Sequence, residues 1–348
     1  MKSTSTYLIG EIGQNHNGSV EIAKLLTEIA ARPVTDHLFQ RKFKGFNAIK
    51  LTKRDLKEEL AQAKMNEAYT SQHSFGETYG EHRAKLELSD EQHLEVYRHA
   101  KEHGIEFVET ICAVGCLSLL KLFTPDYLKV ASRDLTNLPL LAALAETQLP
   151  IILSTGMAGQ EELDNALAVI TRYHSHISIL HCVSEYPTQY QHVNLNTIPY
   201  LKAKYPNYAI GYSDHTIGIS IPVAAVAAGA TVLEKHITVD RKLKGTDQAS
   251  SLGIDGIERM VRDIRNLELA LGEYGIFAEE AVNPTRKKLE RSIASTRLIE
   301  EGEVITEKDI HLLSPGDGFK WLEKDRVVGK RATSRIPANE IIYANLIH

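Results

Sequence analysis

The sequence has few cysteines and no long apolar run. Its three cysteines, Cys112, Cys116 and Cys182, form no CxxC pair, so we expect reduced thiols rather than a disulfide framework or a structural zinc site. No segment approaches the roughly 18 to 20 apolar residues of a membrane span. The opening stretch MKSTSTYLIGEIG lacks the apolar core of a secretion signal. We therefore expect a cytoplasmic protein that does not bind a membrane.

An excess of positive charge is also absent. Lys and Arg number 40 against 45 Asp and Glu, a formal net charge of −5, which argues against nucleic acid as a partner. No GxGxxG motif follows an apolar run, so a dinucleotide-binding fold has little support. The 348 residues, 43% hydrophobic and 24% charged, have the composition of a globular protein with a large core.

Short apolar runs alternate with amphipathic patterns through most of the chain. Eight runs predict strands, at residues 6–13, 46–52, 105–110, 127–132, 150–155, 178–183, 209–214 and 231–238. Eight strand–helix units in succession predict an α/β protein with a (β/α)₈ TIM barrel rather than an open doubly wound sheet. In the last helical pattern Asp255 and Glu258 predict a capping box, and one buried face is predicted from Ile257, Met260, Val261 and Ile264.

The character of the sequence changes after the barrel. We place the barrel domain at residues 1–283, a polar linker with a basic triplet at 284–290, and a small β-rich domain at 291–348. Within the small domain, GEVITEKDI (302–310) and NEIIYANLI (339–347) share one pattern of acidic, apolar and polar positions. This similarity predicts two related halves of a compact β fold.

Two insertions lengthen the connections of the predicted barrel. Residues 33–45 extend the first connection from helix to strand, on the side of a barrel that is usually structural. Residues 53–88 follow the second strand, and their centre, YTSQHSFGETYGEHR, is rich in aromatic, histidine and charged residues. A long loop on this side predicts a lid over the active site.

Two histidines follow the seventh and eighth predicted strands. Because neighbouring strands lie about 4.8 Å apart, His215 and His236 are expected to project over the barrel mouth, where they can share one divalent ion. Glu11 and Asp247 would add carboxylates. Such a ligand set suits Mn²⁺, Mg²⁺, Co²⁺ or Fe²⁺, and two hydrogen-bonded histidines without a metal are the alternative.

Two lysines, Lys50 and Lys129, lie within otherwise apolar predicted strands. A buried lysine is costly unless it meets an anion, so these side chains predict a phosphate or carboxylate site. Hydroxyl donors for that anion are expected from Ser132, Ser154, Ser184 and Ser213. The alternatives are ion pairs with barrel carboxylates for the lysines and capped turns for the serines.

Several motifs in order along the chain resemble those of the sialic acid synthase family. They are EIGQNHNG (11–18), YTSQHSFGETYGEH (69–82), ILSTGM (152–157), HCVSEYP (181–187), IGYSDHTIG (210–218) and LEKHIT (233–238). The tail resembles the C-terminal antifreeze-like (SAF) domain of that family. The resemblance implies a homodimer in which each small domain caps the barrel of the partner.

The resemblance also implies a reaction. Family enzymes condense phosphoenolpyruvate with a mannose-type aldose (N-acetylmannosamine, mannose or a 6-phosphate) to a nine-carbon 2-keto-3-deoxy acid and phosphate. It implies a divalent metal at His215 and His236, with manganese the first expectation and magnesium or cobalt the alternatives. Substrate-binding residues are then expected at Lys50, Thr110, Lys129, Ser132, Ser154, Ser184, Tyr186 and Ser213. Proton transfer would fall to Glu11 or Asp134, and Asp247 would contact metal-bound water or sugar hydroxyls.

Some positions depart from the family pattern and leave the sugar open. Thr52 occupies a position that is commonly glutamine in the family, Cys112 one that is commonly a large residue, and Arg133 that of the glycine in the usual GSG motif. Ser314 occupies the position of an arginine that in the family lies near the sugar's acylamino group. Arg133 would contact either a sugar phosphate or the neighbouring Asp134. Two other functions stay open: a metal-dependent aldolase that uses pyruvate, and a non-catalytic sugar-binding protein on the same scaffold.

Overall fold

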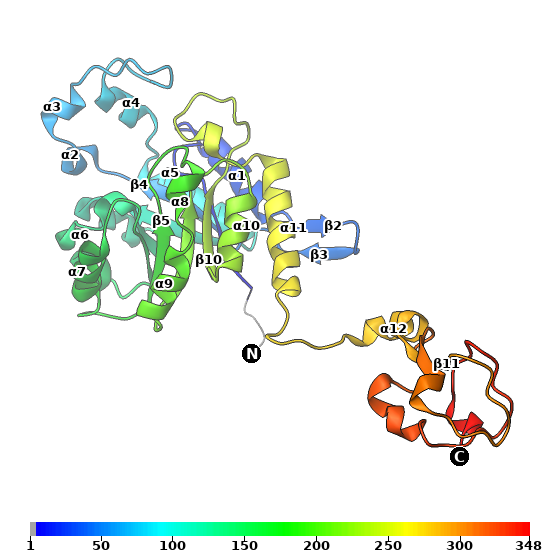
Figure 1. Cartoon of the computed structure of the whole chain (residues 1–348). Coiled ribbons are helices and arrows are strands. Elements are labelled where there is room, and N and C mark those ends of the chain that lie inside the picture. Colours follow the sequence, from blue (N-terminus) through cyan, green and yellow to red (C-terminus); the bar gives the residue numbers. More distant parts are fainter. Residues whose placement is uncertain (1–4) are drawn as a thin grey trace. The chain divides into compact units, whose positions relative to one another are not determined.

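Eight parallel strands form a closed barrel in the computed structural model, which describes residues 5–348. The first four residues of the predicted 1–283 domain lie outside the described part. Neighbours around the barrel follow the order β1-β10-β9-β8-β7-β6-β5-β4, and β1 pairs with both β10 and β4 (Figure 1). The strands are β1 (Tyr7–Glu11), β4 (Ala48–Lys53), β5 (Glu106–Ile111), β6 (Tyr127–Val130), β7 (Ile151–Ser154), β8 (Ile177–Cys182), β9 (Ala209–Asp214) and β10 (Val232–His236). The predicted TIM barrel is confirmed.

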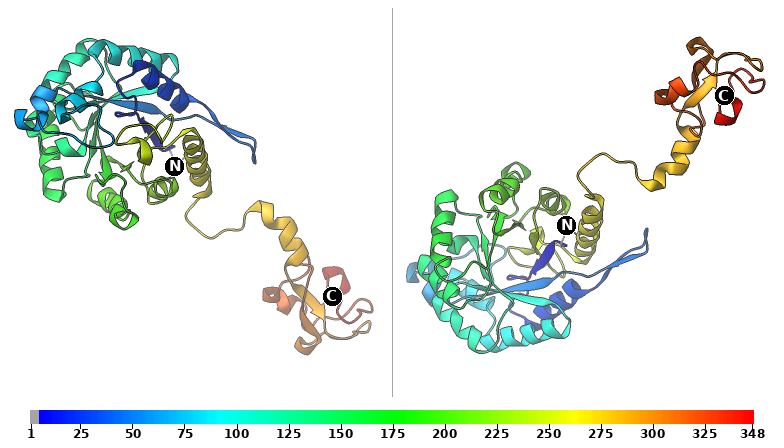
Figure 2. Two further views of the ribbon diagram at one scale, coloured as in Figure 1. Left: turned by 90° about the horizontal axis from the view of Figure 1, so that it is seen from above. Right: turned by 90° about the horizontal axis from the view of Figure 1, so that it is seen from below.

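Helices surround the barrel and cover the outer face of its strands (Figure 2). They are α1 (Val20–Ala31), α5 (Asp90–Glu102), α6 (Leu138–Glu146), α7 (Gln160–Ile170), α8 (Tyr190–Val193), α9 (Thr197–Lys204), α10 (Ser220–Ala227) and α11 (Ile254–Ala270). Between β5 and β6 a 3₁₀ segment, Val114–Lys121, takes the place of an α-helix. Apolar side chains of these elements and of the outward strand positions form the main core.

Alternation along the strands decides which side chains enter the barrel. An apolar cluster inside it is formed by Ile9, Ala48, Val108, Ile152, Leu180 and Val232. Two positions further along the same strands lie Glu11, Lys50, Thr110, Ser154, Cys182 and Glu234. The apolar layer therefore closes the floor of the barrel, and the mostly polar layer lies above it at the carboxyl ends of the strands.

The two insertions form different structures. Residues 33–45 contain an antiparallel hairpin of β2 (Val34–Asp36) and β3 (Arg41–Phe43), which is tied to α11 because the Asn266 amide donates to Asp36 Oδ2 at 2.9 Å. The insertion after β4 contains three short helices, α2 (Leu56–Glu59), α3 (Gln62–Met65) and α4 (Tyr79–Lys85). A capping box of Thr78 and Glu81 begins α4.

The prediction for α11 is right in its buried face and wrong in its cap. Ile257, Met260, Val261 and Ile264 are buried as expected. The helix begins at Ile254, with Gly253 at the N-cap and no side-chain cap hydrogen bond. Asp255 therefore lies inside the first turn. Its negative charge interacts favourably with the positive end of the helix dipole, but its side chain does not cap the helix.

The chain divides into two compact units, Met1–Gly272 and Glu273–His348. The second has its own core, which includes Ile293, Ile305, Ile310 and Ile342, and a two-stranded antiparallel sheet of β11 (Ser292–Ser295) and β12 (Ile310–Leu313). Helix α12 (Asn283–Leu289) occupies most of the predicted linker, and its Leu289 carbonyl accepts a hydrogen bond from Ser314 Oγ at 2.9 Å.

The two similar segments of the second unit share local geometry. Gly302 (φ +77°) and Asn339 (φ +63°) occupy equivalent positions in the left-handed region, which glycine and asparagine tolerate best. Five residues after each of them a 3₁₀ turn begins, at Glu307–Asp309 and at Ala344–Leu346. This agreement supports the predicted relation between the two halves.

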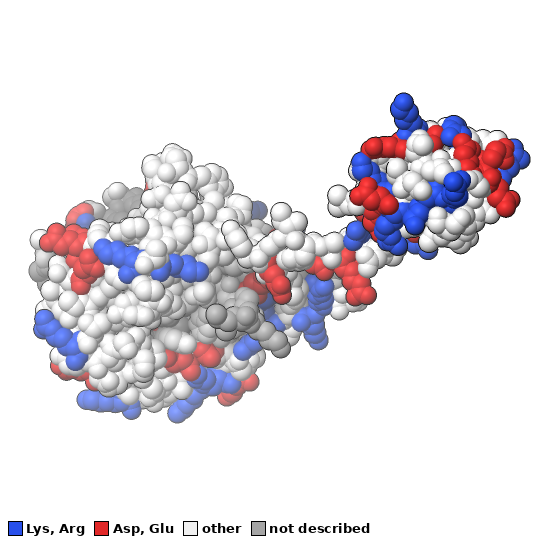
Figure 3. All heavy atoms as spheres, turned by 60° about the horizontal axis from the view of Figure 1, so that its bottom comes forward, with Lys and Arg blue, Asp and Glu red and all other residues white. Residues whose placement is uncertain are grey.

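The surface of the described chain mixes charges of both signs. On the face shown in Figure 3, Lys and Arg side chains lie beside Asp and Glu side chains over both units. Among the described helices, none is long and apolar enough to cross a membrane.

Candidate active site

A cavity of about 270 Å³ opens at the carboxyl ends of the barrel strands. Its wall includes eleven of the residues expected at the site: Glu11, Lys50, Thr110, Lys129, Ser132, Ser154, Tyr186, Ser213, His215, His236 and Asp247. They come from β1, β4, β5, β6, β7, β9 and β10 and from the loops that follow the strands, because inward positions alternate along each strand. The cavity is thus lined from nearly the whole circumference of the barrel.

The Lys50 ammonium is held by two buried carboxylates. Its Nζ lies 2.5 Å from Glu11 Oε2 and 3.7 Å from Glu234 Oε1. It also donates to Thr110 Oγ1 at 3.2 Å, and the lysine is only 5% exposed. Lys50 therefore forms ion pairs with barrel carboxylates, which was the alternative to an anion site. These ion pairs lie in the same cavity that would receive an anion.

Lys129 has a different environment. Its Nζ donates to Ser154 Oγ at 2.8 Å and to the Val130 carbonyl at 3.0 Å. No carboxylate of the described residues lies within 4.0 Å of this nitrogen. An ammonium has three N–H donors, so one donor of Lys129 is available to a ligand.

Burial and mutual attraction shift the pKa values of this cluster. Burial raises the pKa of Glu11 to about 7, although Lys50 opposes the rise. Burial would also raise the pKa of Glu234, but the ammonium groups of Lys129 and Lys50 outweigh it and hold this pKa below its usual range. Burial lowers the pKa of Lys129. An anion bound beside Lys129 would reverse that last shift because it stabilises the charged form.

Hydroxyl groups surround the lysines. Ser213 Oγ donates to Glu234 Oε1 at 2.9 Å. Ser132 Oγ and Ser184 Oγ lie 2.7 Å apart and form what we call the serine pair. The backbone of Gly156 packs against this pair: a Cβ at Gly156 would lie 2.3 Å from Ser184 Oγ.

The two histidines fit a divalent ion. Their ring centroids lie 5.5 Å apart. His215 Nδ1 donates to the Val183 carbonyl at 2.8 Å, which leaves the lone pair of Nε2 free for a metal. His236 Nδ1 is buried, accepts no hydrogen bond from the described residues, and lies 4.0 Å from Asp247 Oδ2. Burial lowers the pKa of both imidazoles, so both are neutral at pH 7, the form that binds metals.

Two of the expected site residues lie outside the cavity wall. Ser184 does not line the cavity, but its hydroxyl is hydrogen-bonded to that of Ser132, which does. Asp134 lines an adjoining cavity instead, and its Oδ2 accepts from Arg133 Nε at 3.2 Å. Burial raises the pKa of Asp134.

Other polar groups near the strand ends face the helices. His93 Nδ1 lies 2.9 Å from Glu109 Oε2, and Lys235 Nζ lies 2.5 Å from Asp214 Oδ2. His181 Nε2 donates to the Val193 carbonyl at 2.6 Å. Glu109 and His181 are bonded in this way to α5 and α8, whereas Lys235 and Asp214 join the neighbouring strands β10 and β9.

Sequence reasoning assigned no role to several residues of the cavity wall. Glu234 precedes His236 by two positions and therefore faces the same side of β10, a signal that was available in the sequence. Arg54 and Arg83 also line the cavity. They belong to the insertion after β4, whose course could not be deduced from alternation.

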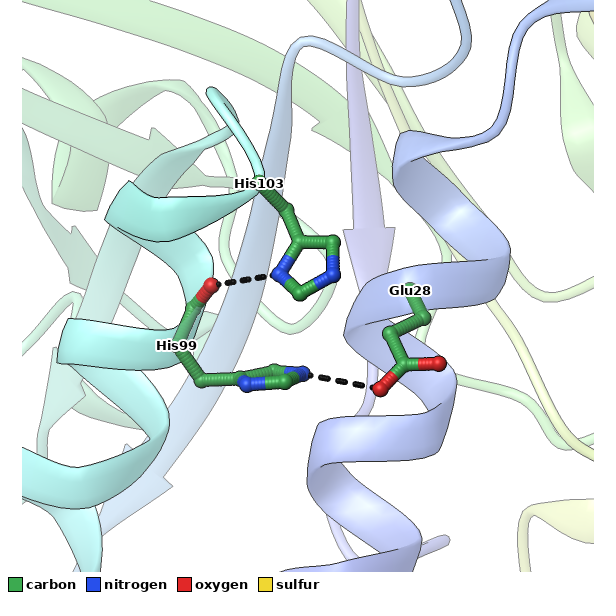
Figure 4. A group of neighbouring side chains, drawn as sticks. All are labelled: Glu28, His99 and His103. Atoms are coloured by element: carbon green, nitrogen blue, oxygen red, sulfur yellow. Dashed lines mark hydrogen bonds and ion pairs between the residues drawn. The ribbon is translucent and has the colours of Figure 1, made fainter.

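A second group of metal-binding side chains lies on the outside of the barrel. Glu28 on α1 and His99 and His103 at the end of α5 each offer one ligand atom, and these atoms lie within 4.8 Å of one another (Figure 4). His99 Nε2 is 3.1 Å from Glu28 Oε1, and His103 Nδ1 donates to the His99 carbonyl. The end of α5 leads into the start of β5, so this group lies toward the opposite end of the barrel from the cavity.

Comparison with known proteins gives matches along nearly the whole chain. The sequence profile of the NeuB family matches residues 40–275, and that of the SAF domain matches residues 290–347. N-acetylneuraminate-9-phosphate synthase of Homo sapiens is 33% identical over 346 residues, 98% of this chain and 92% of its own length. N,N'-diacetyllegionaminic acid synthase of Legionella pneumophila is 34% identical over 341 residues, 97% of this chain and 93% of its own.

Solved structures agree with these matches. The N-acetylneuraminic acid synthetase of Leptospira borgpetersenii, solved in complex with citrate, is 32% identical with a TM-score of 0.66. The match covers 81% of this chain and 90% of that chain.

Proposed function

This chain belongs to the NeuB family, the sialic and nonulosonic acid synthases, and we propose that it condenses phosphoenolpyruvate with a mannose-type aldose. The products are a nine-carbon 2-keto-3-deoxy acid and inorganic phosphate. The observation that carries the proposal is a single cavity whose wall contains both a buried ammonium without a close carboxylate, Lys129, and the two histidines. An acidic phosphate ester and a polarised aldehyde are the two reactants that such a cavity suits.

The lysines and hydroxyls would hold phosphoenolpyruvate. Lys129 offers its remaining N–H donor, and Ser132 and Ser154 add neutral donors around it, while Ser213 lines the same cavity and donates its hydroxyl proton to Glu234. Lys50 is neutralised in part by Glu11, so it contributes more to orientation than to net charge. Together these groups would fix the enol carbon C3 toward the histidine side of the cavity.

The histidines would hold the metal. His215 and His236, with Asp247 beside them, would bind a divalent ion, for which manganese is the first expectation and magnesium or cobalt the alternatives. When bound, such an ion supplies Lewis-acid polarisation of the aldehyde oxygen.

The bonds change in a defined order. C3 of phosphoenolpyruvate forms the new carbon–carbon bond with the aldehyde carbon, water adds at C2, and the C2–O bond breaks to release phosphate. Of the two carboxyls predicted to move protons, Glu11 lines the cavity, whereas Asp134 is paired with Arg133 outside it. We therefore assign proton transfer to Glu11.

The reaction is tested by measuring phosphate release with each reactant omitted in turn. Release is expected only when phosphoenolpyruvate and an aldose are both present, and it should stop with EDTA and return with Mn²⁺. In H₂¹⁸O the released phosphate should contain no solvent oxygen, because the C–O bond breaks. Product formation from pyruvate instead of phosphoenolpyruvate would refute the proposal in favour of an aldolase.

Assembly is a separate part of the proposal. We expect a homodimer in which the SAF unit of each subunit covers the barrel of the other. Light scattering after size exclusion should give twice the chain mass of 38.8 kDa. A monomer that is fully active would contradict this arrangement.

A further inference from the structure

Three arginines gather at one side of the cavity, beyond the residues assigned above. Arg54, Arg83 and Arg133 all line the main cavity. The same three side chains also line the adjoining cavity of about 340 Å³, together with Glu59 and Asp134. They therefore form the wall at which the two cavities meet, and we call them the arginine wall.

The arginine wall and the histidines follow different strands of the barrel. Arg54 follows β4, Arg133 follows β6, and Arg83 lies on α4 of the insertion after β4. His215 follows β9 and His236 ends β10. In the closed order of eight strands, β6 is opposite β10, whereas β4 is separated from β10 by β1 alone. An extended molecule with one end at His236 would thus point its other end toward Arg133, with Arg54 and Arg83 at the β4 and β1 side of the same cavity.

Two of the guanidinium groups keep free donors. Arg83 Nη1 donates to Gln14 Oε1 at 2.9 Å, and among the described residues no carboxylate lies within 4.0 Å of Arg83. Arg54 Nη1 lies 3.2 Å from Glu59 Oε2, and its Nε lies 3.7 Å from Glu87 Oε1. That Nε is buried and makes no hydrogen bond to any described residue. The Arg54 Nε is enclosed by the protein, so the donors left for a ligand are chiefly those of Arg83, whose guanidinium lacks a close carboxylate.

Arg133 is better neutralised but still orients the wall. Its Nε donates to Asp134 Oδ2 at 3.2 Å, and its Nη2 donates to Cys112 Sγ at 2.7 Å and lies 3.5 Å from Glu59 Oε2. These contacts hold the guanidinium plane in one orientation. Burial, reinforced by the positive charges of Arg54 and Arg133, lowers the pKa of Arg83, which reflects the crowding of cations in this wall.

We infer that the arginine wall binds an anionic group at the far end of the acceptor sugar, so that the preferred acceptor is a mannose-type aldose 6-phosphate. The inference rests on the proposed condensation and names the acceptor class of the same site. Guanidinium groups suit a phosphate because their planar forks donate paired hydrogen bonds to its oxygens. With its aldehyde at the histidines, the open-chain sugar would span the cavity and place carbon 6 at the arginines.

Kinetics with two sugars test the inference. The wild-type protein, with Mn²⁺ and saturating phosphoenolpyruvate, is expected to have a kcat/KM at least 100-fold higher for N-acetylmannosamine 6-phosphate than for N-acetylmannosamine. Arg83→Gln should raise the KM for the phosphorylated sugar at least tenfold and change kcat less than threefold, and Arg83→Lys should recover part of the loss. Arg262→Gln, on the exposed side of α11, is the matched control and should change nothing.

The outcomes separate this inference from the proposed function. Equal use of both sugars by the wild type would overturn the inference while the condensation stands. A rise in the KM for phosphoenolpyruvate in Arg83→Gln, with the KM for the sugar unchanged, would show that the wall binds the other phosphate and would also overturn it. If no aldose is condensed, the proposed function fails. Calorimetry would then decide about the wall, because mannose 6-phosphate must bind to the wild type and not to Arg83→Gln.

Discussion

Replacing Lys129 by methionine should separate binding of phosphoenolpyruvate from stability of the fold. Lys129 is 2% exposed, and its ammonium makes two hydrogen bonds, to Ser154 and to the Val130 carbonyl. Methionine has a similar length, so the change removes charge and donors with little change in volume. The remaining donor of Lys129 is the one that we assign to the anion.

The expected loss of affinity follows from the bond that is removed. A hydrogen bond between a charged donor and an anion contributes about 1.5 to 3 kcal/mol, so KM for phosphoenolpyruvate should rise about 10- to 150-fold. The free energy of unfolding should change by less than about 1 kcal/mol. The two lost hydrogen bonds and the lost attraction between Lys129 and Glu234 are offset because the cost of burying a charge that has no carboxylate within 4.0 Å disappears as well.

Lys50→Met is the contrasting variant. It removes the partner of Glu11 at 2.5 Å and of Glu234 at 3.7 Å, and so leaves Glu11 without its close cation and Glu234 with Lys129 alone. Breaking a buried pair in this way costs about 3 to 5 kcal/mol. Urea unfolding should therefore show a large loss for Lys50→Met and almost none for Lys129→Met.

Circular dichroism is the suitable probe of unfolding. The single tryptophan, Trp321, lies in the C-terminal unit and would not report on the barrel, whereas the helices of the barrel dominate the signal at 222 nm. The reasoning would be refuted if Lys129→Met were as unstable as Lys50→Met, or if its KM for phosphoenolpyruvate rose less than threefold.

Three further predictions concern the metal, the serine pair and acid stability. His236→Gln should abolish turnover, whereas His103→Gln, in the outer metal-binding group, should keep it and lose at most one bound ion in a zinc titration; turnover by His236→Gln would contradict the metal assignment. Gly156→Ala should raise KM for phosphoenolpyruvate about tenfold and destabilise the fold by about 1 to 3 kcal/mol, because its Cβ would lie 2.3 Å from a hydroxyl of the serine pair. Gly275→Ala, whose Cβ would make only ordinary contacts at 3.5 Å with Phe277, is the control in both assays. Burial lowers the pKa of His16 to about 3, so between pH 6.5 and 5 the unfolded chain binds a proton that the folded chain does not. The free energy of unfolding should therefore decrease as the pH is lowered from 6.5 to 5. His16→Asn should make this decrease smaller by about 2 kcal/mol in urea titrations, and an unchanged pH dependence would refute the reasoning.

Much of the barrel was predictable because its strands are short, apolar and regularly spaced. Each of the eight predicted runs overlaps one observed strand, and the differences at their ends are a few residues. The cap of α11 was predicted wrongly, since Asp255 and Glu258 have capping-box spacing although the chain enters the helix at Gly253. Local pattern places a helix, but tertiary contacts decide where the first turn begins.

Much of the cavity wall was predictable for the same reason, because alternation of period two separates inward from outward residues. Lys50 and Thr110 could be placed inside from their strands alone. The insertion after β4 carries no such periodicity, and its aromatic residues pack on one another: the His82 ring lies 4.6 Å from that of Tyr69 and 5.9 Å from that of Phe75. The place of Arg83 depends on this packing and on its bond to Gln14, neither of which sequence spacing reveals.

The difference between the two lysines explains how one small cavity can receive a highly charged reactant and still fold. A cavity with two unpaired buried ammonium groups would be costly in the free protein, and one with both lysines paired would repel an anion through its carboxylates. Here Lys50 is closely paired and Lys129 is not, while Glu11, with a pKa raised to about 7, has a readily reversible charge. Binding of an anion beside Lys129 would favour protonation of Glu11, because a nearby negative charge raises the pKa of a carboxyl. Protonation of Glu11 would remove one negative charge from the cavity and so reduce its repulsion of the anion. Uptake of a proton on binding of phosphoenolpyruvate, measured in buffers of different ionisation enthalpy, should therefore occur in the wild type and be lost in Glu11→Gln; equal proton uptake in both proteins would show that this carboxyl has no part in accommodating the charge.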